Sequence, residues 1–371
     1  YEPLLRVKAP IFEAQLIETA MLNIVNHQTL IAYKAARVCQ AAQGDLVMEF
    51  GLRRAQGPDA GLYGARAALI AGCGSTSNVL AGKMFDVPVA ETHAHSWVMS
   101  FPDELTAFRA YADAYPDACL LLVDTYDTLG SGMPNAIRVF RELREKGHEP
   151  LGVRLDSGDL SYLSRRARRM LDEAGFPNAK ICASGDLDED VIWDLKQQGA
   201  CIDTWGVGTR MITSDGCAAL GGVYKMSAEI KISENPSKVT NPGIKKVQRI
   251  YNREGMAMAD LILLESEQID PAKPLTIFHP VDTWKRQTYT DYTLRDLLVP
   301  VFVDGKCVYE RPTLKQIQAY CQKEISTLWE QYRRRLNPHV YKVDLSYELY
   351  ALRHKLLNQA RTEMDDLPPL Q

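Results

Sequence analysis

Between residues 87 and 207, short apolar runs alternate with helical patterns, and this alternation constrains the fold more than any other feature of the chain. The apolar runs predict strands at 87–91, 119–124, 149–154, 180–184 and 202–207. Helical patterns occupy the intervals at 103–114, 134–147, 159–174 and 188–198. Nearly continuous apolar strands joined by helices are typical of a parallel sheet that is buried on both faces. A barrel and a doubly wound sheet both satisfy this pattern.

The positions of glycine and polar residues favour the barrel. No G-x-G-x-x-G follows the first predicted strand at 46–52, although a dinucleotide-binding sheet would carry one there. Polar residues instead end many different strands, and the carboxyl ends of barrel strands build active sites. We predict an irregular (β/α) barrel domain in residues 1–228. This domain includes a long, core-facing N-terminal helix at 12–42 that bends around Asn26 and His27.

The pattern changes after residue 228, where prolines punctuate short apolar segments as far as 312. Antiparallel strands and loops are expected there, followed by a charged helix at 313–336 and a helical pattern at 345–363. Residues 229–371 are therefore predicted to form an α+β extension with C-terminal helices.

Composition excludes several classes of function. The 43 Lys and Arg residues against 47 Asp and Glu give a net charge of −4, which indicates neither a nucleic-acid nor a membrane surface. The eight cysteines form no C-x-x-C pair and no Cys/His cluster, which is typical of reduced thiols in a cytoplasmic enzyme. No signal peptide and no membrane-spanning apolar run is found.

The tetrapeptide SGDL occurs twice, at 157–160 and 184–187, each time between an apolar run and a helical pattern. Glycine at such a strand end lets backbone N–H groups approach a phosphate, as at Gly185. The first copy follows Arg154 and Asp156, which are two residues apart and face the same side of an extended strand. A cation and an anion that share one pocket suggest chemistry on a charged substrate.

Other strand ends carry further candidates, each with a structural alternative. Arg53 or Arg54 would bind a carboxylate or phosphate, or form a surface ion pair. His93 and His95 allow three alternatives: one of them acts as nucleophile or acid/base, one of them is a hydrogen-bonded core histidine, or, least favoured, the two form a metal site.

Two loops offer phosphate or metal contacts. The phrase VDTYDTLGSG contains Asp124 and Asp127, which would organise Mg²⁺ or a ribose hydroxyl, or else cap a turn. In WGVGTRM, the residues Gly206, Gly208 and Thr209 have the composition of a backbone nest around a phosphate.

The order of these phrases carries a family resemblance over essentially the whole chain. FGLRRAQGPD, GSTSNVLAG, THAHSWVMSF, DTYDTLGSG, GVRLDSGDL, GVGTRM, GGVYKM and KVTNPGIKKVQRIYN resemble nicotinate phosphoribosyltransferases, which are type II phosphoribosyltransferases of NAD salvage. The resemblance implies transfer of a phosphoribosyl group from 5-phosphoribosyl-1-pyrophosphate to nicotinate, with release of pyrophosphate. It also implies coupling to ATP hydrolysis through a phosphohistidine, a requirement for Mg²⁺, and a homodimer.

The resemblance also assigns roles to matching positions. His95 is the phosphohistidine, and Asp156 and Asp127 are the acidic positions near the ribose and Mg²⁺. The nicotinate site would contain Thr92, Arg154, Arg53 and Ser77. The phosphoribosyl site would contain four further residues, Gly185, Gly206, Gly208 and Thr209.

Nicotinate is expected over nicotinamide because residues 75–78, Ser-Thr-Ser-Asn, contain no carboxylate that would accept from an amide. Family members also carry a region ahead of the long helix, with a ring-stacking tyrosine, and this sequence starts after it. Two alternatives stay open. One is a nicotinamide phosphoribosyltransferase; the other, which follows from the missing region, is a truncated barrel that dimerises and binds phosphate ligands without turnover.

Overall fold

The computed structural model describes residues 2–227, 241–282 and 284–365, with side chains described up to residue 359. The chain divides into two compact units. One contains residues 23–221 and 312–322, and is called here the parallel-sheet unit. The other contains residues 1–22, 222–311 and 323–371, and is called the antiparallel-sheet unit. The expected domain boundary at residues 228 and 229 lies outside the described residues.

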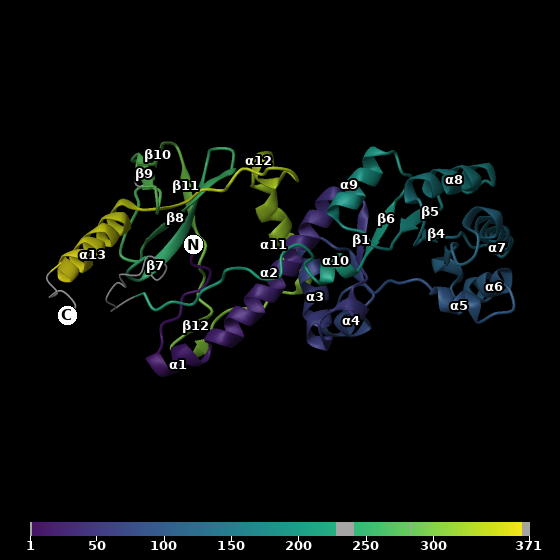
Figure 1. The fold of residues 1–371 in the computed structure, drawn as a ribbon, viewed down its shortest axis with the longest axis horizontal. Coiled ribbons are helices and arrows are strands. Elements are labelled where there is room, and N and C mark those ends of the chain that lie inside the picture. The colour runs from purple at the N-terminus through teal and green to yellow at the C-terminus, as the bar shows by residue number, and fades with distance from the viewer. Residues whose placement is uncertain (1, 228–240, 283, 366–371) are drawn as a thin grey trace. The chain divides into compact units, whose positions relative to one another are not determined.

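Six strands form the sheet of the parallel-sheet unit. They are β1 (Leu46–Glu49), β2 (Ser75–Thr76), β3 (Leu120–Leu122), β4 (Gly152–Leu155), β5 (Lys180–Ala183) and β6 (Thr204–Val207). All neighbours are parallel, in the order β2-β1-β6-β5-β4-β3, and Figure 1 shows β1, β6, β5 and β4 side by side. The sheet is curled and open, a half-barrel, and the predicted α/β fold with an irregular barrel is confirmed in this form.

The predicted strand at 87–91 is reduced to a single parallel bridge between Val89 and Thr76 of β2. β2 is one edge strand of the sheet, and β3 is the edge strand at the other end of the strand order. The Leu122 N–H of β3 donates to His93 Nε2 at 3.2 Å, so a side chain from the 87–93 segment reaches the far edge strand. A side-chain hydrogen bond thus replaces the missing strand ladder.

Helices follow the strands much as the sequence predicts. Beside the parallel sheet lie α3 (Pro58–Ala71), α4 (Val79–Phe85), α5 (His95–Met99), α6 (Glu104–Ala114), α7 (Met133–Glu145), α8 (Leu160–Glu173), α9 (Glu189–Gln197) and α10 (Thr209–Ile212). Short helical turns occur at η1 (Leu52–Arg54), η2 (Pro116–Ala118) and η3 (Thr128–Gly132). The N-caps Asn78, Asp103, Asp159 and Asp188 each accept from a backbone N–H of their helix.

The long N-terminal helix differs from its prediction. Two helices, α1 (Ile11–Leu16) and α2 (Glu18–Ala41), meet at Ile17, and α2 runs unbroken through Asn26 and His27. The second half of α2 buries Leu30, Ile31 and Val38, whereas Leu16 and Ile24 are exposed. The apolar spacing was therefore correct for a helix, but only its C-terminal half faces a core.

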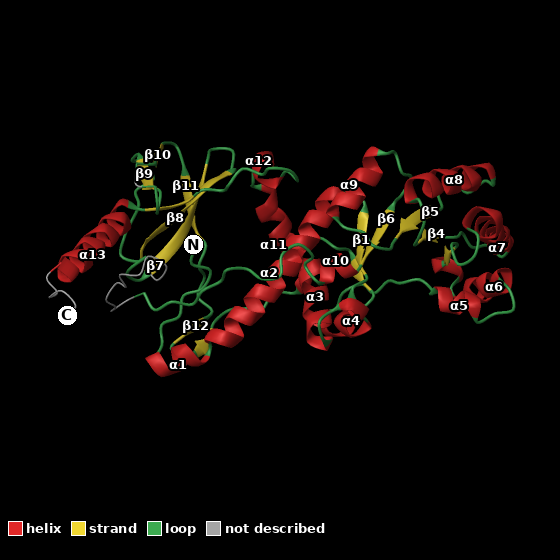
Figure 2. Ribbon diagram, in the orientation of Figure 1, coloured by secondary structure: helices red, strands yellow, loops and turns green. Residues whose placement is uncertain are grey.

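The antiparallel-sheet unit contains a second six-stranded sheet, shown with its strands in yellow in Figure 2. Its strands are β7 (Lys245–Tyr251), β8 (Ala257–Leu264), β9 (Leu275–Phe278), β10 (Arg286–Tyr289), β11 (Thr293–Asp296) and β14 (Val343–Leu345), in the order β10-β9-β14-β8-β7-β11. A hairpin of β12 (Phe302–Val303) and β13 (Lys306–Cys307) stands apart from this sheet. The predicted helix at 313–336 is divided into α11 (Leu314–Ser326) and α12 (Glu330–Arg333), and α13 (Tyr347–Asp365) follows β14.

Of the helices in these described ranges, none combines the length and the apolar character that crossing a membrane requires.

Candidate active site

The two faces of the parallel sheet bury different side chains. On β1, Val47 packs into the large cluster that includes the helices, whereas Met48 joins Leu120 and Cys182 in a small cluster on the other face. Phe50 packs against this second cluster. Because side chains alternate along a strand, the concave side of the half-barrel is lined by a few apolar residues and then, at the strand ends, by polar ones.

Arg154, on β4, is the centre of the polar group on the concave side. Its Nε donates to Ser184 Oγ at 2.7 Å, Nη1 donates to Thr92 Oγ1 at 2.7 Å, and Nη2 donates to Asp156 Oδ1 at 2.9 Å. Only 13% of its side chain is exposed. A guanidinium has five N–H groups, so one on each terminal nitrogen is left for a ligand. The three bonds fix the plane in which those two donors lie.

An aromatic ring lies below this guanidinium. The Arg154 Cζ atom is 5.3 Å from the centroid of Phe50, the residue that follows β1. Gly206 on β6 makes this position accessible, because a Cβ there would come within 2.5 Å of the Phe50 ring. A planar ligand with a carboxylate would find both a ring to stack on and a guanidinium to pair with.

Asp156 follows β4 and completes the charge pattern. Its Oδ1 accepts from Arg154 and from the Ser184 hydroxyl, which leaves Oδ2 for a cation or a sugar hydroxyl. Burial acts to raise the pKa of Asp156, but the Ser184 hydrogen bond and the Arg154 charge outweigh it and lower that pKa below its usual value. The carboxylate is therefore ionised at neutral pH.

His95 lies at the start of α5 and faces the carboxylate of Asp124, which follows β3. His95 Nε2 and Asp124 Oδ1 are 3.1 Å apart. Asp124 is held in turn, since its Oδ2 accepts from the Asp156 N–H at 2.9 Å and from the Ser157 hydroxyl at 2.6 Å. The imidazole is 39% exposed and the Asp124 carboxylate only 1%. A buried, fixed carboxylate thus orients an accessible imidazole.

His93 is the core histidine of the pair. It is buried, its Nε2 accepts the Leu122 N–H, and burial lowers its pKa to about 4. Of the alternatives that the sequence left open, the structure supports one structural and one accessible histidine. Within 2–227, 241–282 and 284–365, no group of three or more His, Cys, Asp or Glu side chains is arranged to hold a metal ion unaided.

The strand ends of β5 and β6 supply close backbone approaches. Gly185 has a φ of +114°, and a Cβ there would come within 2.7 Å of the Asp156 carbonyl oxygen. A Cβ at Gly208 would lie 3.0 Å from the Phe50 carbonyl oxygen. Thr209 begins α10 directly after Gly208. Glycine is required here because the strand-end loops pass each other closely.

Three other predicted site residues stand apart from this group. Arg53 is exposed in η1, and Ser77 follows β2, where its N–H donates to the Glu49 carbonyl at 2.9 Å. Asp127 caps η3 by accepting the Gly130 N–H at 2.9 Å, which is the capping role that the sequence left open. None of these three side chains forms a hydrogen bond to a member of the polar group around Arg154 among the described contacts.

The group defined by Phe50, Thr92, His95, Asp124, Arg154, Asp156 and Ser184 is called here the strand-end site. The sequence prediction included Thr92, His95, Arg154 and Asp156, and it named Asp124 as a candidate for Mg²⁺ or a ribose hydroxyl rather than as a partner of His95; Phe50 and Ser184 were not predicted. Asp124 stands in the same phrase as Asp127, and Ser184 opens the second SGDL, so both motifs pointed at the correct loops. Phe50 is the first residue of FGLR. Its position under a guanidinium depends on Arg154, which lies on another strand, β4.

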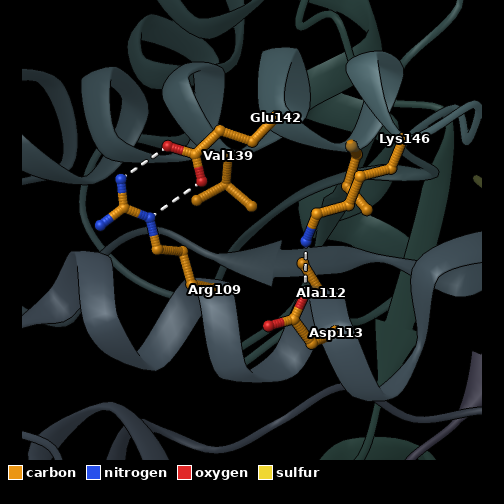
Figure 3. A pocket seen from close by; sticks show the side chains of 7 residues that line it. Arg109, Ala112, Asp113, Val139, Glu142 and Lys146 are labelled. Carbon is orange, nitrogen blue, oxygen red and sulfur yellow. Dashed lines mark hydrogen bonds and ion pairs between the residues drawn. The ribbon is translucent and has the colours of Figure 1, made fainter.

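A shallow hollow between α6 and α7 has a different character (Figure 3). Its lining is a ladder of ion pairs: Arg109 binds Glu142 bidentately at 2.6 and 2.8 Å, and Lys146 binds Asp113 at 2.7 Å. Each charge already has its partner, and the hollow lies between helices rather than at strand ends. It carries no sign of catalytic chemistry.

Comparison with known proteins agrees with this geometry. Residues 46–253 match the model of the nicotinate phosphoribosyltransferase (NAPRTase) family, and residues 244–353 match the nicotinate phosphoribosyltransferase C-terminal domain. A nicotinate phosphoribosyltransferase of Bacillus subtilis is 50% identical over 375 residues, which is 98% of this chain and 76% of that protein. A human nicotinate phosphoribosyltransferase is 33% identical, over 95% of this chain and 77% of its own length.

Solved structures show the same relationship. The crystal structure of human nicotinic acid phosphoribosyltransferase superposes with a TM-score of 0.83 at 31% identity, over 94% of this chain and 78% of that one. A nicotinate-nucleotide pyrophosphorylase from Pyrococcus furiosus shares the fold with a TM-score of 0.62 at 23% identity. With a family model matched over more than half of its residues, this chain belongs to the nicotinate phosphoribosyltransferase family.

Proposed function

We propose that the strand-end site binds nicotinate and 5-phosphoribosyl-1-pyrophosphate and transfers the phosphoribosyl group to the pyridine nitrogen. The observation that carries this proposal is Arg154, which three strand-end residues hold above Phe50 with two N–H groups left over. Nicotinate offers both a ring for Phe50 and a carboxylate for Arg154. The relatives that this chain matches over most of their length bear the name of this activity.

The transfer forms one bond and breaks one. The lone pair of the pyridine nitrogen forms the bond to C1 of the ribose, while the bond from C1 to the pyrophosphate oxygen breaks and its electrons leave with pyrophosphate. The sugar passes through a cationic state, which the ionised Asp156 stabilises. We assign the departing phosphates and the 5-phosphate to the backbone at Gly185, Gly208 and Thr209, which follow β5 and β6 beside Asp156 and Phe50.

The choice of the acid over the amide follows from the donors available. A carboxylate needs N–H donors, which Arg154 supplies, whereas an amide N–H₂ needs an acceptor. The nearest buried carboxylate beside the 75–78 turn is Glu49, and both of its oxygens already accept protein hydrogen bonds. It therefore has little to offer an amide, and nicotinate is the expected substrate.

We also propose that ATP is coupled to this transfer through phosphorylation of His95. With Nε2 hydrogen-bonded to Asp124, the lone pair of the neutral imidazole lies on Nδ1. Nδ1 would attack the γ-phosphorus, so that a nitrogen–phosphorus bond forms as the bond to the ADP oxygen breaks. The imidazole becomes positively charged in this step, and the Asp124 carboxylate, 1% exposed, stabilises that charge.

Magnesium fits the strand-end site as a partner of bound phosphates. Mg²⁺ commonly takes one or two protein carboxylates together with phosphate oxygens, so a preformed cage is not required. Asp156 Oδ2 is the group of the strand-end site that we assign to it, and Asp127, which caps η3 outside that group, is the second carboxylate of the assignment made from sequence. When bound, it would neutralise the charge of the leaving pyrophosphate.

We further propose a cytoplasmic homodimer. All eight cysteines are free thiols, as expected in a reducing compartment. Large apolar side chains are exposed along the N-terminal segment, at Leu4, Leu5, Val7, Ile11, Phe12 and Leu16. A second copy of the chain is the cover that we expect for them. Sedimentation equilibrium tests this, and a chain that stays monomeric at micromolar concentration would refute the dimer.

Labelled ATP tests the phosphohistidine. Incubation with γ-labelled ATP is expected to give a protein-bound phosphoryl group that is labile in acid and stable in base, and His95→Ala should abolish it. The matched control is His148→Gln, which removes an exposed histidine whose Nδ1 lies 2.7 Å from Asp117. It should label like the unaltered chain. A label that persists in His95→Ala contradicts the mechanism.

A further inference from the structure

Glu49 is a fully buried acid that the proposed transfer does not use. It ends β1, and none of its surface is exposed. It alternates with Met48 and Phe50, so its carboxylate points to the outer face of the sheet, behind the strand-end site. A buried carboxylate is retained only where specific hydrogen bonds compensate for its lost hydration.

Both carboxylate oxygens are used, and each secures a different loop. Oε1 accepts the Gly51 N–H at 2.5 Å, and Oε2 accepts the Thr76 hydroxyl at 2.6 Å. Thr76 Oγ1 accepts in turn from the Asn78 N–H at 3.0 Å. One side chain therefore connects the loop after β1 to the end of β2, and through Thr76 to Asn78 in the loop that follows.

The local backbone is shaped to permit this arrangement. A Cβ at Gly51 would lie 2.8 Å from Glu49 Oε1 and 2.4 Å from Ile212 Cβ, so glycine is needed for the carboxylate to reach the N–H. Burial raises the pKa of Glu49, while the bonds from Thr76 and Gly51 favour its ionised form. Phe50 stands between Glu49 and Gly51, and so its backbone is restrained on both sides.

We infer that Glu49 is a positioning residue for the pyridine acceptor: by hydrogen bonding to Gly51 and Thr76 it fixes the loops that carry Phe50, Arg53 and Ser77. This inference rests on the proposed function and specifies the part of the site that binds nicotinate. The loops after β5 and β6, assigned to the phosphoribosyl group, receive no hydrogen bond from the Glu49 side chain among the described contacts. The segment after β6 meets the loop after β1 by packing, at Gly208 and Ile212, so the larger effect of Glu49 should fall on nicotinate.

Two variants of Glu49 test the inference by steady-state kinetics. Glu49→Leu removes both acceptors and should raise the KM for nicotinate at least about tenfold, because small displacements of a binding loop have large effects. The KM for 5-phosphoribosyl-1-pyrophosphate should stay within about threefold. Glu49→Gln keeps an oxygen for Gly51 and can donate its amide to Thr76 Oγ1, so it should restore the nicotinate KM.

A matched control exists in the antiparallel-sheet unit. Glu267 is also buried, and its Oε1 accepts a backbone N–H from Leu264 and the Ser346 hydroxyl, both at 2.7 Å. Glu267→Leu should lower stability and leave both KM values unchanged. Should Glu49→Leu fail to fold, Thr76→Val and Thr76→Ser give the same comparison, with the nicotinate KM raised in the first and preserved in the second.

Two results would overturn the inference: an unchanged nicotinate KM in Glu49→Leu, or equal increases for both substrates. A second readout separates this failure from failure of the proposed function. Amide hydrogen exchange at Gly51 should accelerate in Glu49→Leu whether or not the chain turns over nicotinate. Absent turnover in the unaltered chain refutes the proposed function alone, whereas unchanged exchange at Gly51 refutes the positioning role.

Discussion

Arg154 in the parallel-sheet unit and Arg249 in the antiparallel-sheet unit are both largely buried arginines with three protein acceptors. Two of the three acceptors of Arg154 are neutral hydroxyls. All three acceptors of Arg249 are carboxylate oxygens, from Asp260 at 2.7 and 2.8 Å and from Glu324 at 3.2 Å. Arg249 therefore has three carboxylate oxygens at hydrogen-bonding distance, whereas Arg154 has one, from Asp156, and a second carboxylate, Glu91, only at 3.9 Å.

This difference separates a structural role from a binding role. Arg295 also binds Glu324, so both arginines of this cluster are paired with carboxylates. Arg154 has one carboxylate at hydrogen-bonding distance, Asp156, and its other two acceptors are hydroxyls that orient it, so its charge is less fully compensated than that of Arg249 and still attracts an anionic ligand. Removing Arg249 should therefore affect folding, and changes around Arg154 should affect substrate binding.

The largest effect on stability is expected from Arg249→Gln. The Asp260 carboxylate, 1% exposed, would lose its bidentate partner, and breaking a buried pair in this way lowers the free energy of unfolding by about 3–5 kcal/mol. Urea denaturation measures this loss, and activity per folded molecule should stay unchanged. A loss below about 1 kcal/mol would mean that the network is as weak as an exposed ion pair, and the comparison would fail.

His93 should make the parallel-sheet unit sensitive to pH. Burial lowers its pKa from 6.5 to about 4, so the folded chain holds it neutral while the unfolded chain takes up a proton. Stability is then full above pH 6.5 and falls as the pH is lowered toward 4. At pH 5 the loss is on the order of 2 kcal/mol.

The control for this prediction is His93→Gln, whose side-chain oxygen can still accept the Leu122 N–H without titrating. Its free energy of unfolding should lack the component of pH dependence that the unaltered chain shows between pH 7 and 5. Equal slopes for the two chains would show that His93 does not titrate as the structure predicts.

Thr92→Val should weaken catalysis without unfolding the chain. Valine keeps the shape but removes the oxygen that accepts from Arg154 Nη1 at 2.7 Å. We expect kcat/KM for nicotinate to fall about tenfold, which is the scale of one hydrogen bond to a charged group. Thr276→Val is the matched control, because it removes one hydroxyl from the Thr276–Thr288 pair of the antiparallel sheet. Equal losses in both variants would contradict a specific role for Thr92.

The smallest effect is expected at the hollow between α6 and α7. Arg109→Gln removes an exposed ion pair with Glu142, and such pairs contribute little to stability. Activity should stay within about twofold and the midpoint of thermal unfolding should move only slightly. A large loss of activity would show that this hollow, and not only the strand ends, takes part in function.

Much of the parallel sheet could be predicted from sequence because its strands are short apolar runs between helices. The predicted strands at 119–124, 180–184 and 202–207 contain β3, β5 and β6, and the one at 149–154 overlaps β4 except for its last residue, Leu155. The segment at 87–91 has the same composition but pairs only through Val89. On its other side, the chain is linked to β3 by the hydrogen bond from the Leu122 N–H to the His93 side chain. Sequence periodicity alone does not reveal such a contact.

The candidate site was predicted less completely, for a physical reason. Arg154 lies on β4 and Asp156 directly follows that strand, so their spacing alone places them together. Phe50 and Ser184 join them only through the order of neighbouring strands, which the sequence does not state. Asp124 and Asp127 are three residues apart in one loop, and only the fold shows that Asp124 faces His95 while Asp127 caps η3.

The most direct test of the account is the substrate preference of Arg154→Gln. The unaltered chain should use nicotinate far better than nicotinamide. In the variant, kcat/KM for nicotinate should fall about 100-fold, since two hydrogen bonds to a carboxylate are lost, while the value for nicotinamide changes little. Equal losses for the two substrates, with the fold intact, would contradict a guanidinium that recognises the carboxylate of nicotinate.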